Sequence, residues 1–187
     1  MPAADVRLAR ADDAAEIARI QRSTWQLAFG DLLEPAALEA LGGPDAEQQW
    51  SAAIAHEGTD VFIATEGPHV VGFCVCGPAP SAELEGPDGQ LPDDAEHTGL
   101  VATLLVEPRW GRRGHGARLL AAAARALRSR GAQRAVTWVA ESDSATLSFY
   151  RRAGWAPEGT LRRLDTGRRQ IRELRLAGGL EVQLAVQ

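Results

Sequence analysis

Two consecutive strand–turn–helix units in the second half of the chain constrain its fold more strongly than any other feature. The first unit begins with a continuous apolar run over residues 99–106, which is typical of a buried central strand. A turn rich in glycine and proline leads from this strand into an amphipathic helix that ends near Gly131. The second unit repeats the order, with a short apolar strand over residues 136–140 and a helix over residues 144–153. This alternation predicts a mixed α/β fold.

The first half of the chain adds helices and a hairpin to these units. Helical periodicity predicts three helices, over residues 13–29, 35–41 and 44–56. In the first of them, Asp13 and Glu16 have the spacing of a capping box, and Gly30 stops the helix. Strands are predicted over residues 6–10, 60–65 and 70–76, of which the last two form a hairpin. Residues 78–94 hold four prolines and several acids and predict a long loop.

The C-terminal part of the chain is predicted to form a second hairpin. Its strands cover residues 160–165 and 171–176, on either side of Gly167. Residues 181–187 alternate weakly and could form an extra strand, which could serve as the interface of a homodimer, so the oligomeric state stays open. The chain has neither an internal repeat nor a convincing linker, and its 187 residues fit one domain spanning residues 1–187.

Composition excludes several classes of protein. The net charge of -5 argues against a nucleic-acid binder, whose affinity depends on neutralising phosphates. No apolar run approaches the roughly 18 residues of a membrane span, and the first ten residues lack the apolar core of a signal peptide. Cys74 and Cys76 are too close for a disulfide framework, and no other thiol could complete a zinc site, so no metal is expected. We therefore expect a cytoplasmic protein without a membrane or nucleic-acid partner.

The distribution of charge is more informative than its sum. All twenty basic residues are arginines, and eight of them lie between residues 109 and 134, where no acid occurs. Six acids and no base lie between residues 83 and 96. Each run could be an ordinary solvated face. Alternatively, the basic run could meet an anionic cofactor and the acidic run a cationic acceptor.

The turn after the strand at 99–106 favours anion binding. Three glycines and three arginines lie within eight residues: Gly111, Gly114 and Gly116 with Arg109, Arg112 and Arg113. Glycines allow the backbone to approach a ligand, and the helix that follows presents unpaired N–H groups and a partial positive charge. The sequence matches neither a P-loop nor the dinucleotide-binding fingerprint. The turn alone therefore predicts a phosphate or pyrophosphate site, or simply a tight turn with surface arginines.

The second unit supplies the other half of a recognisable pattern. Together the two units resemble the GNAT superfamily of acyl-CoA N-acyltransferases. The first signature of that family is a strand, a proline, and then Arg/Gln-x-x-Gly-x-Gly/Ala opening a helix; it maps onto Val106, Pro108 and residues 111–116. The second is an asparagine, a tyrosine seven residues later, and Gly-Phe four and five residues beyond. It maps, in that order, onto Asp143, Tyr150, Gly154 and Trp155. Thr24-Trp25, the strand at 61–65 and Val71-Gly72-Phe73 are also similar, so the resemblance covers about residues 5–176.

The resemblance implies a fold and a cofactor site. The fold is a mixed, strongly twisted sheet of about seven strands with helices on both faces and a splayed central strand pair. The cofactor, acetyl-CoA, would lie in that gap, with its pantetheine amides extended by the backbone of Leu105 and Val106. N–H groups would hold its pyrophosphate, and the turn residues implied are Gly111, Arg112, Arg113, Gly114, His115, Gly116 and Ala117. His115 is expected to act there through its backbone rather than as a titrating group. Tyr150 would be the general acid for the departing thiolate, and Trp25 could line the acceptor pocket or pack in the core.

The chain departs from the family pattern at several positions. Gly111 stands where the family has Arg or Gln, and Arg112 stands where a small residue is common. Asp143 replaces Asn and cannot donate a hydrogen bond when ionised, which puts its pantetheine contact in doubt. Leu100 occupies the position at which many members carry a catalytic Glu.

The missing base leaves an energetic problem. An amine with a pKa of about 10.4 is neutral in only about one part in 2,500 at pH 7. The candidate bases nearest in sequence are Glu96, His97 and Glu141. Glu96 could equally be a solvated loop carboxylate, His97 a surface histidine, and Glu141 a cap of the following helix.

The sequence therefore predicts an N-acetyltransferase that moves an acetyl group from acetyl-CoA to a primary amine by direct transfer in a ternary complex. Its partners would be the acyl-CoA and an amine-bearing acceptor. One alternative is a non-catalytic acyl-CoA-binding regulatory module that has lost the base. Another is a transferase that uses a larger acyl-CoA, such as succinyl- or malonyl-CoA. The acidic run favours a cationic acceptor only weakly, and the acceptor itself is left open.

Overall fold

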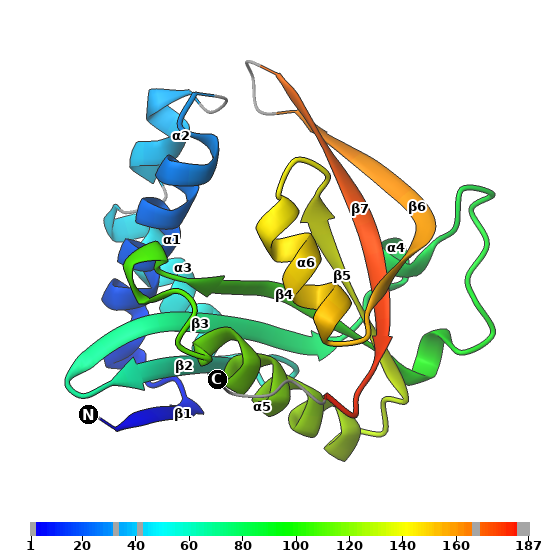
Figure 1. Ribbon diagram of the computed structural model, residues 1–187, viewed down its shortest axis with the longest axis horizontal. Coiled ribbons are helices and arrows are strands. Elements are labelled where there is room, and N and C mark those ends of the chain that lie inside the picture. The colour runs from blue at the N-terminus through cyan, green and yellow to red at the C-terminus, as the bar shows by residue number, and fades with distance from the viewer. Residues whose placement is uncertain (1–2, 32–33, 41–42, 166–168, 183–187) are drawn as a thin grey trace.

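The computed structural model describes residues 3–31, 34–40, 43–165 and 169–182. Within these residues, seven strands form one sheet in the order β1-β2-β3-β4-β5-β7-β6 (Figure 1). The strands are β1 (Ala4–Leu8), β2 (Asp60–Glu66), β3 (His69–Pro78), β4 (Thr98–Val106), β5 (Arg134–Ala140), β6 (Ala156–Asp165) and β7 (Gln170–Gly179). All neighbouring pairs are antiparallel except β4 and β5, which are parallel. The predicted mixed sheet is thus confirmed.

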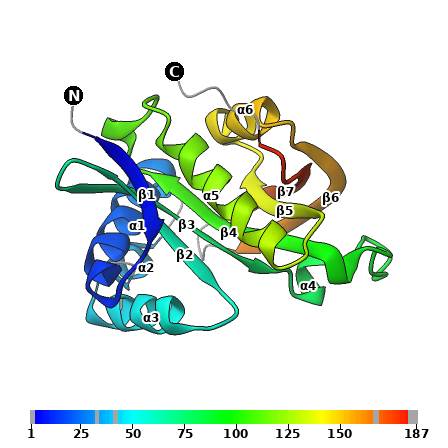
Figure 2. The same cartoon turned by 90° about the horizontal axis from the view of Figure 1, so that it is seen from below.

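Helices cover both faces of this sheet. They are α1 (Ala14–Phe29), α2 (Pro35–Ala40), α3 (Pro44–Ala55), α4 (Ser81–Leu84), α5 (His115–Ser129) and α6 (Ser144–Arg152). Seen from below, α1 and α3 lie on one side of β2–β4, and α5 lies on the other (Figure 2). Three short 3-10 turns complete the elements: η1 (Ala11–Asp13), η2 (Ala95–His97) and η3 (Pro108–Trp110).

Alternation along the strands explains why two separate cores form. Neighbouring residues of a strand point to opposite faces of a sheet. Phe73 in β3 accordingly packs with Ile17 and Ile20 of α1, whereas the next residue, Cys74, packs in the cluster that includes Leu120 of α5. The apolar faces of α1 and α5 therefore each pack against alternate residues of the same strand, on opposite faces of the sheet.

Both cysteines belong to the core beneath α5. Cys74 and Cys76 are free thiols and fully buried. Burial raises the pKa of the Cys74 thiol well above its ordinary value and that of Cys76 to about 12. Neither thiol is therefore a reactive thiolate at neutral pH, and both serve as small apolar packing residues.

The start of α1 differs from its prediction, although its end does not. The predicted capping box between Asp13 and Glu16 is wrong, because Asp13 makes no capping bond to α1. Instead Asp13 is buried, accepts a hydrogen bond of 2.7 Å from the backbone N–H of Arg10, and forms an ion pair with Arg7 of β1. The carboxylate thus caps the start of the turn η1 and ties this turn to the first strand.

Two other segments also differ from their predictions. The stretch at 78–94 is not wholly a loop, because Pro78 still belongs to β3 and residues 81–84 form α4. The predicted C-terminal hairpin forms from β6 and β7, and its turn at Gly167 lies outside the described residues. Glu181 and Val182 belong to no strand, and the remainder of the predicted strand at 181–187 also lies outside them.

Candidate active site

The two parallel strands at the centre of the sheet part soon after they meet. Although β4 has nine residues and β5 has seven, only residues 98–100 of β4 pair with residues 134–136 of β5. Beyond this point β4 carries one extra residue, Ala102, because Val101 and Thr103 pair with consecutive residues of β3. Residues 103–106 are half-buried although they lie in a central strand. The expected splayed strand pair is therefore present, and it leaves a free strand edge in the middle of the sheet.

A buried hydroxyl marks the point where the strands part. Thr137, the first residue of β5 beyond the paired segment, donates a hydrogen bond of 2.8 Å from Oγ1 to the carbonyl oxygen of Val101. This side-chain bond replaces a backbone bond that the diverging strands can no longer make.

Tyr150 lies beside this point, on the α5 side of the sheet. Its ring packs between Phe149 and Trp155, with centroids 5.1 and 5.2 Å away, and only 2% of the residue is exposed. Burial raises the pKa of the phenol well above its ordinary value, with a further contribution from Cys74, and a hydrogen bond with Thr137 lowers it only in part. The phenol therefore stays protonated at neutral pH and is able to donate a hydrogen bond.

The turn between β4 and α5 presents a row of unpaired backbone donors. The N–H groups from Arg112 to Ala117 make no hydrogen bond to any residue that the structure describes, and the first backbone bond of the helix joins Arg118 N–H to Gly114 O at 3.0 Å. Arg112 and Gly114 have φ angles of +62° and +79°, so the backbone alternates its direction here. Such alternation at a helix N-terminus gathers N–H groups into a concave site for an anion.

Two of the three arginines of this turn are paired with carboxylates of the protein itself. Arg113 Nη1 lies 2.7 Å from Glu66, and Arg109 Nε lies 3.2 Å from Glu107. Both guanidinium groups also lie over the ring of Trp110, at 5.7 Å for Arg109 and 5.0 Å for Arg113. Arg112, by contrast, makes no ion pair with a described residue.

His115 points into the protein rather than toward the turn's open side. It is the first residue of α5 and is 1% exposed. Its Nε2 lies 2.8 Å from Glu66, and its Nδ1 is buried without a partner among the described residues. Sequence reasoning did not single out Glu66, because nothing in the composition of β2 signals that its last residue meets a helix 49 positions later.

The small residue at position 116 brings two helices together. A Cβ atom on Gly116 would lie 3.3 Å from the ring of Phe149 in α6 and 3.8 Å from Leu104 in β4. The glycine therefore allows the start of α5 to approach the helix that carries Tyr150. This packing places the turn and the buried phenol on the same side of the sheet.

Asp143 has a structural task in this chain. It is the residue that caps α6, and its carboxylate accepts a hydrogen bond of 3.0 Å from the backbone N–H of Thr146. Asp and Asn cap helices about equally well, which explains why Asp is accepted where the family has Asn. The interpretation of Glu141 as the cap of this helix is wrong, since Asp143 holds that position.

The three candidate bases are not brought together at the parting of the strands. Glu96 and His97 are exposed and lie in η2, just before the paired end of β4. Glu141 lies beyond the opposite end of β5, where it forms a half-exposed ion pair of 3.2 Å with Arg172.

The opposite face of the sheet carries a second set of side chains near the parting. Leu100 pairs with Val136 across the two strands, so Leu100, Val136 and Trp138 share one face. That face is turned away from α5, because the neighbouring Gly99 approaches Leu127 of α5. The position of the missing Glu, now Leu100, therefore faces the same side as Trp138.

A pocket of about 560 Å³ includes Trp138 in its lining, together with residues of α4, the segment after it and β6. The indole N–H of Trp138 donates to Glu83 of α4 over 2.6 Å, and Arg162 of β6 lies 4.4 Å above the ring. Trp138 was not a predicted site residue. Alternation along β5 could have indicated its face, because Trp138 is two residues after Val136, the partner of Leu100. Trp25 lies on α1, where it is half-buried and its ring centroid is 5.7 Å from that of Phe29.

The acidic run is partly neutralised by arginines of the sheet. Glu83 pairs with Arg162 over 3.1 Å, and Asp94 pairs with Arg134 over 2.6 Å. The Arg134 guanidinium lowers the pKa of the Asp94 carboxyl below its usual value. These ion pairs fasten the segment to β5 and β6.

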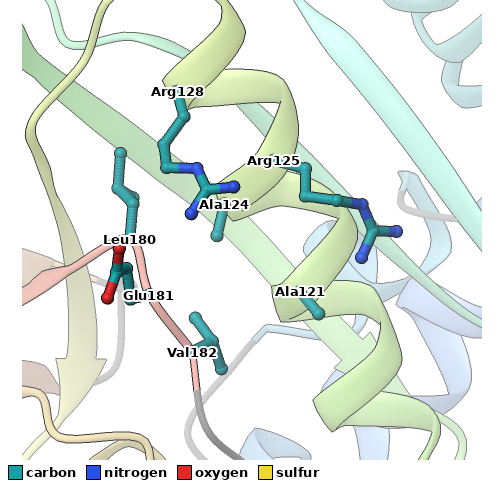
Figure 3. A pocket seen from close by; sticks show the side chains of 7 residues that line it. All are labelled: Ala121, Ala124, Arg125, Arg128, Leu180, Glu181 and Val182. Atoms are coloured by element: carbon teal, nitrogen blue, oxygen red, sulfur yellow. The ribbon is translucent and has the colours of Figure 1, made fainter.

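A second pocket lies on the outer side of α5, close to its C-terminal half. It has a volume of about 270 Å³ and is lined by α5 and residues 180–182. Arg128 extends from α5 toward Leu180 and Glu181, whereas Arg125 points away from them (Figure 3). Neither pocket includes a residue of the turn at 111–117.

Two features are absent from the described part of the chain. No helix there is both long and apolar enough to cross a membrane. No group of three or more His, Cys, Asp or Glu side chains is arranged there to hold a metal ion.

Known proteins share this sequence pattern. The model of the GNAT acetyltransferase family matches residues 16–155. A protein of Mycobacterium tuberculosis named as a probable N-acetyltransferase is 26% identical over 156 residues, which cover 82% of this chain and 80% of that protein. YuaI of Bacillus subtilis, named as an uncharacterized N-acetyltransferase, is 30% identical over 154 residues, which cover 82% of this chain and 79% of YuaI.

Solved structures share the fold at lower identity. The PaiA N-acetyltransferase of Thermoplasma acidophilum, in complex with coenzyme A, matches with a TM-score of 0.72 and 14% identity over 95% of this chain and 99% of that one. YncA of Salmonella typhimurium, with its cofactor acetyl-CoA, matches with a TM-score of 0.69 and 17% identity over 99% and 98% of the two chains. The splayed sheet, the sequence relatives and the family model agree: this chain belongs to the GNAT family of acetyltransferases and is an N-acyltransferase.

Proposed function

We propose that the protein transfers an acetyl group from acetyl-CoA to a primary amine, directly and within a ternary complex. One observation carries this proposal: β4 and β5 part next to a buried, protonated Tyr150. A strand edge that opens in the middle of a sheet suits an extended ligand with amide groups, because such a ligand can complete the strand's hydrogen bonds. Two solved structures of the same fold contain coenzyme A or acetyl-CoA, which supports the choice of cofactor.

The cofactor would lie across two adjoining surfaces. Its pantetheine amides would bond to the backbone of Leu105 and Val106, on the free edge of β4. Its pyrophosphate would accept hydrogen bonds from the N–H groups between Arg112 and Ala117, which have no partner within the described protein. Arg112 is the side chain best able to add a direct phosphate contact, since Arg109 and Arg113 already face carboxylates.

The acid and the acceptor would approach the thioester from opposite faces of the sheet. Tyr150 lies on the α5 side, whereas Leu100 and Trp138 face the other side and would border the acceptor. Attack by the amine forms the C–N bond and a tetrahedral oxyanion. Collapse of the oxyanion breaks the C–S bond, and the thiolate takes the proton of Tyr150. The proton that the attacking nitrogen loses as the amide forms then restores the phenol, so the enzyme returns to its starting state. A thiol with an ordinary pKa near 8.5 is a fair leaving group. Tyr150 still carries the proton that it would donate, because burial raises the pKa of its phenol.

The acceptor has to lose a proton before it can attack. Leu100 offers no carboxylate, and Glu96, His97 and Glu141 lie away from the parting of the strands. The arrangement therefore favours an acceptor that arrives neutral, either because it is weakly basic or because the pocket at Trp138 desolvates it. The same Leu100 favours a second candidate function, a module that binds acyl-CoA without turning it over.

A thiol-release screen tests both candidates. The protein would be incubated with acetyl-, propionyl- or succinyl-CoA and a panel of amines with pKa values from about 7 to 10.4. We expect acetyl-CoA to release free thiol fastest, and weakly basic amines to be better acceptors than strongly basic ones at pH 7. If the protein binds CoA but releases no free thiol from acyl-CoA with any of the amines, that result would contradict the transferase and support the binding module. Preference for succinyl-CoA would reassign the donor.

A further inference from the structure

Glu66 is a buried carboxylate that the proposed mechanism does not use. It is the last residue of β2, and its side chain is 10% exposed. Oε1 accepts a hydrogen bond of 2.7 Å from Arg113, and Oε2 lies 2.8 Å from Nε2 of His115. Both partners belong to the turn at the start of α5, so one strand residue holds two residues of the presumed diphosphate site.

A negative charge at this place is unfavourable for the ligand. Burial alone would raise the pKa of Glu66, but its bonds to His115 and Arg113 outweigh burial and lower the pKa below its ordinary value. The group is therefore a carboxylate at neutral pH, and it accepts a hydrogen bond from each partner. The Glu66 carboxylate repels a bound diphosphate. This repulsion has to be offset by some favourable effect of Glu66 on the conformation of the turn.

The compensating effect is the fixing of the turn. Arg112, directly before Arg113, has a φ of +62°, a strained backbone angle for a residue other than glycine. The bond from Glu66 to Arg113 holds the chain just after this strained residue, and the bond to His115 holds the first residue of the helix. Between them lies Gly114, whose φ is also positive. The directions of the neighbouring N–H groups are set by these dihedral angles.

We infer that Glu66 is a positioning residue for the diphosphate of the acyl-CoA, acting through Arg113 and His115 to hold the N–H groups of residues 112–117 in their binding arrangement. This inference rests on the proposed function. It assigns to Arg113 a role inside the turn rather than a direct bond to phosphate. Fixed donors bind more tightly than mobile ones because less conformational entropy is lost on binding.

The chain supplies a matched control at the other end of the same two elements. Asp60, the first residue of β2, pairs with Arg130 just beyond the C-terminal end of α5, through two hydrogen bonds of 3.0 Å. At about 3.4 Å per strand residue and 1.5 Å per helix residue, β2 and α5 are both roughly 20 Å long. Glu66 and Asp60 therefore join the same strand to opposite ends of the same helix, and only Glu66 does so at the turn.

The experiment compares the wild type with Glu66→Gln and Asp60→Asn. Binding of CoA and of inorganic pyrophosphate would be measured by titration calorimetry, with thermal unfolding of each variant. We expect Glu66→Gln to weaken both probes about tenfold, or ~1.4 kcal/mol. Asp60→Asn should leave both affinities unchanged even where it lowers the unfolding temperature. With an accepted amine, Glu66→Gln should raise KM for acetyl-CoA and leave kcat near its wild-type value.

The outcomes separate the positioning role from its alternatives. If Glu66 merely repelled the ligand, Glu66→Gln would bind CoA more tightly, and that result would overturn the inference. Equal affinities of the two variants would overturn it as well. Glu66→Asp covers the case in which the Gln variant does not fold: it keeps the charge but is too short to reach both partners, and wild-type affinity in this variant would sink the idea. Failure of the wild type to bind CoA would instead contradict the proposed function.

Discussion

Tyr150 combines deep burial with a position beside the parting of β4 and β5, and this fixes its ionisation state. Burial raises the pKa of its phenol, so the acid form persists throughout the pH range of an ordinary assay. A general acid is useful only while it keeps its proton. The environment that makes Tyr150 a core residue therefore also makes it a suitable donor.

We predict that Tyr150→Phe lowers kcat by about 100-fold or more while leaving KM for acetyl-CoA largely unchanged, because the phenyl ring keeps the packing and loses only the proton. In the wild type, kcat should not decline near pH 10, the ordinary pKa of a phenol, since the folded pKa is higher. Steady-state rates between pH 6 and 10.5 check both statements. A falling alkaline limb that disappears in the Phe variant would contradict them.

Asp13 offers a test of stability at the same scale. Its buried carboxylate pairs with Arg7 and accepts the N–H of Arg10, so Asp13→Asn should lower the free energy of unfolding by about 1–3 kcal/mol at pH 7. Asp12→Asn is the control, because the neighbouring Asp12 is exposed. Urea unfolding of both variants measures the difference, and equal losses would argue against the buried pair.

The pH dependence of this contribution has a definite sign. Burial by itself would raise the pKa of Asp13, but the bonds to Arg7 and to the Arg10 backbone lower it below the unfolded value. Stability from Asp13 is then fully present above the unfolded value of about 3.9 and is lost as the pH falls below it, through the folded pKa. The gap between wild type and Asp13→Asn should accordingly narrow below about pH 4.

At the scale of elements, β7 depends on a glycine to pass the aromatic residue that follows α6. A Cβ atom on Gly178 would collide with the ring of Trp155, which is almost fully buried. Because side chains in a protein interior are close-packed, we expect strand and ring to be compatible only without a side chain at this position.

Gly178→Ala should therefore destabilise the protein by about 3 kcal/mol, at the upper end of overpacking costs. Gly179→Ala, one residue further along β7, should change stability by less than about 0.5 kcal/mol, since a Cβ there meets nothing within 4 Å. Chemical denaturation of the two variants provides the measurement. Similar midpoints would show that Trp155 can shift.

Hydrophobic periodicity and turn residues predicted most helices and strands correctly. Tertiary contacts explain the features that they missed. The helices at 14–29 and 115–129 follow from their apolar faces, which are properties of nearby residues. The capping box at Asp13 failed because Arg7, from a different element, competes for the carboxylate. The one-turn helix at 81–84 is fastened by Glu83 to Trp138 and Arg162, which lie far away in sequence.

At the scale of the whole molecule, sequence predicted the architecture of the site more completely than its chemistry. The turn at 111–117 and Tyr150 are marked by spacing within each unit, and spacing survives in the folded state. The pairing of Glu66 with His115 is not visible in spacing, because it depends on how two distant elements pack. For the same reason, closeness in sequence to β4 did not bring Glu96 or His97 to the parting of the strands.

The composition of the chain and the burial of its thiols together limit the number of sites at which the protein could acetylate itself. Its basic residues are all arginines, so the chain has no lysine amine, and both cysteines are buried with raised pKa values. After incubation of the folded chain with acetyl-CoA, intact-mass spectrometry should find no more than one acetyl group, on the terminal amine. Unfolded protein is the control, in which the thiols become accessible. Two or more groups on the folded chain would contradict this prediction.

The attachment of α5 at both ends to β2 has an evolutionary consequence. One extra residue inside α5 would shift all that follows by about 1.5 Å and rotate it by about 100°, which would separate either Arg130 from Asp60 or His115 from Glu66. The strand and the helix can therefore change length only together. Insertions and deletions among descendants of this chain should accumulate instead in loops such as residues 86–93. This loop is held at its two ends by Glu85 and Asp94, but no helix or strand geometry sets the number of residues between them.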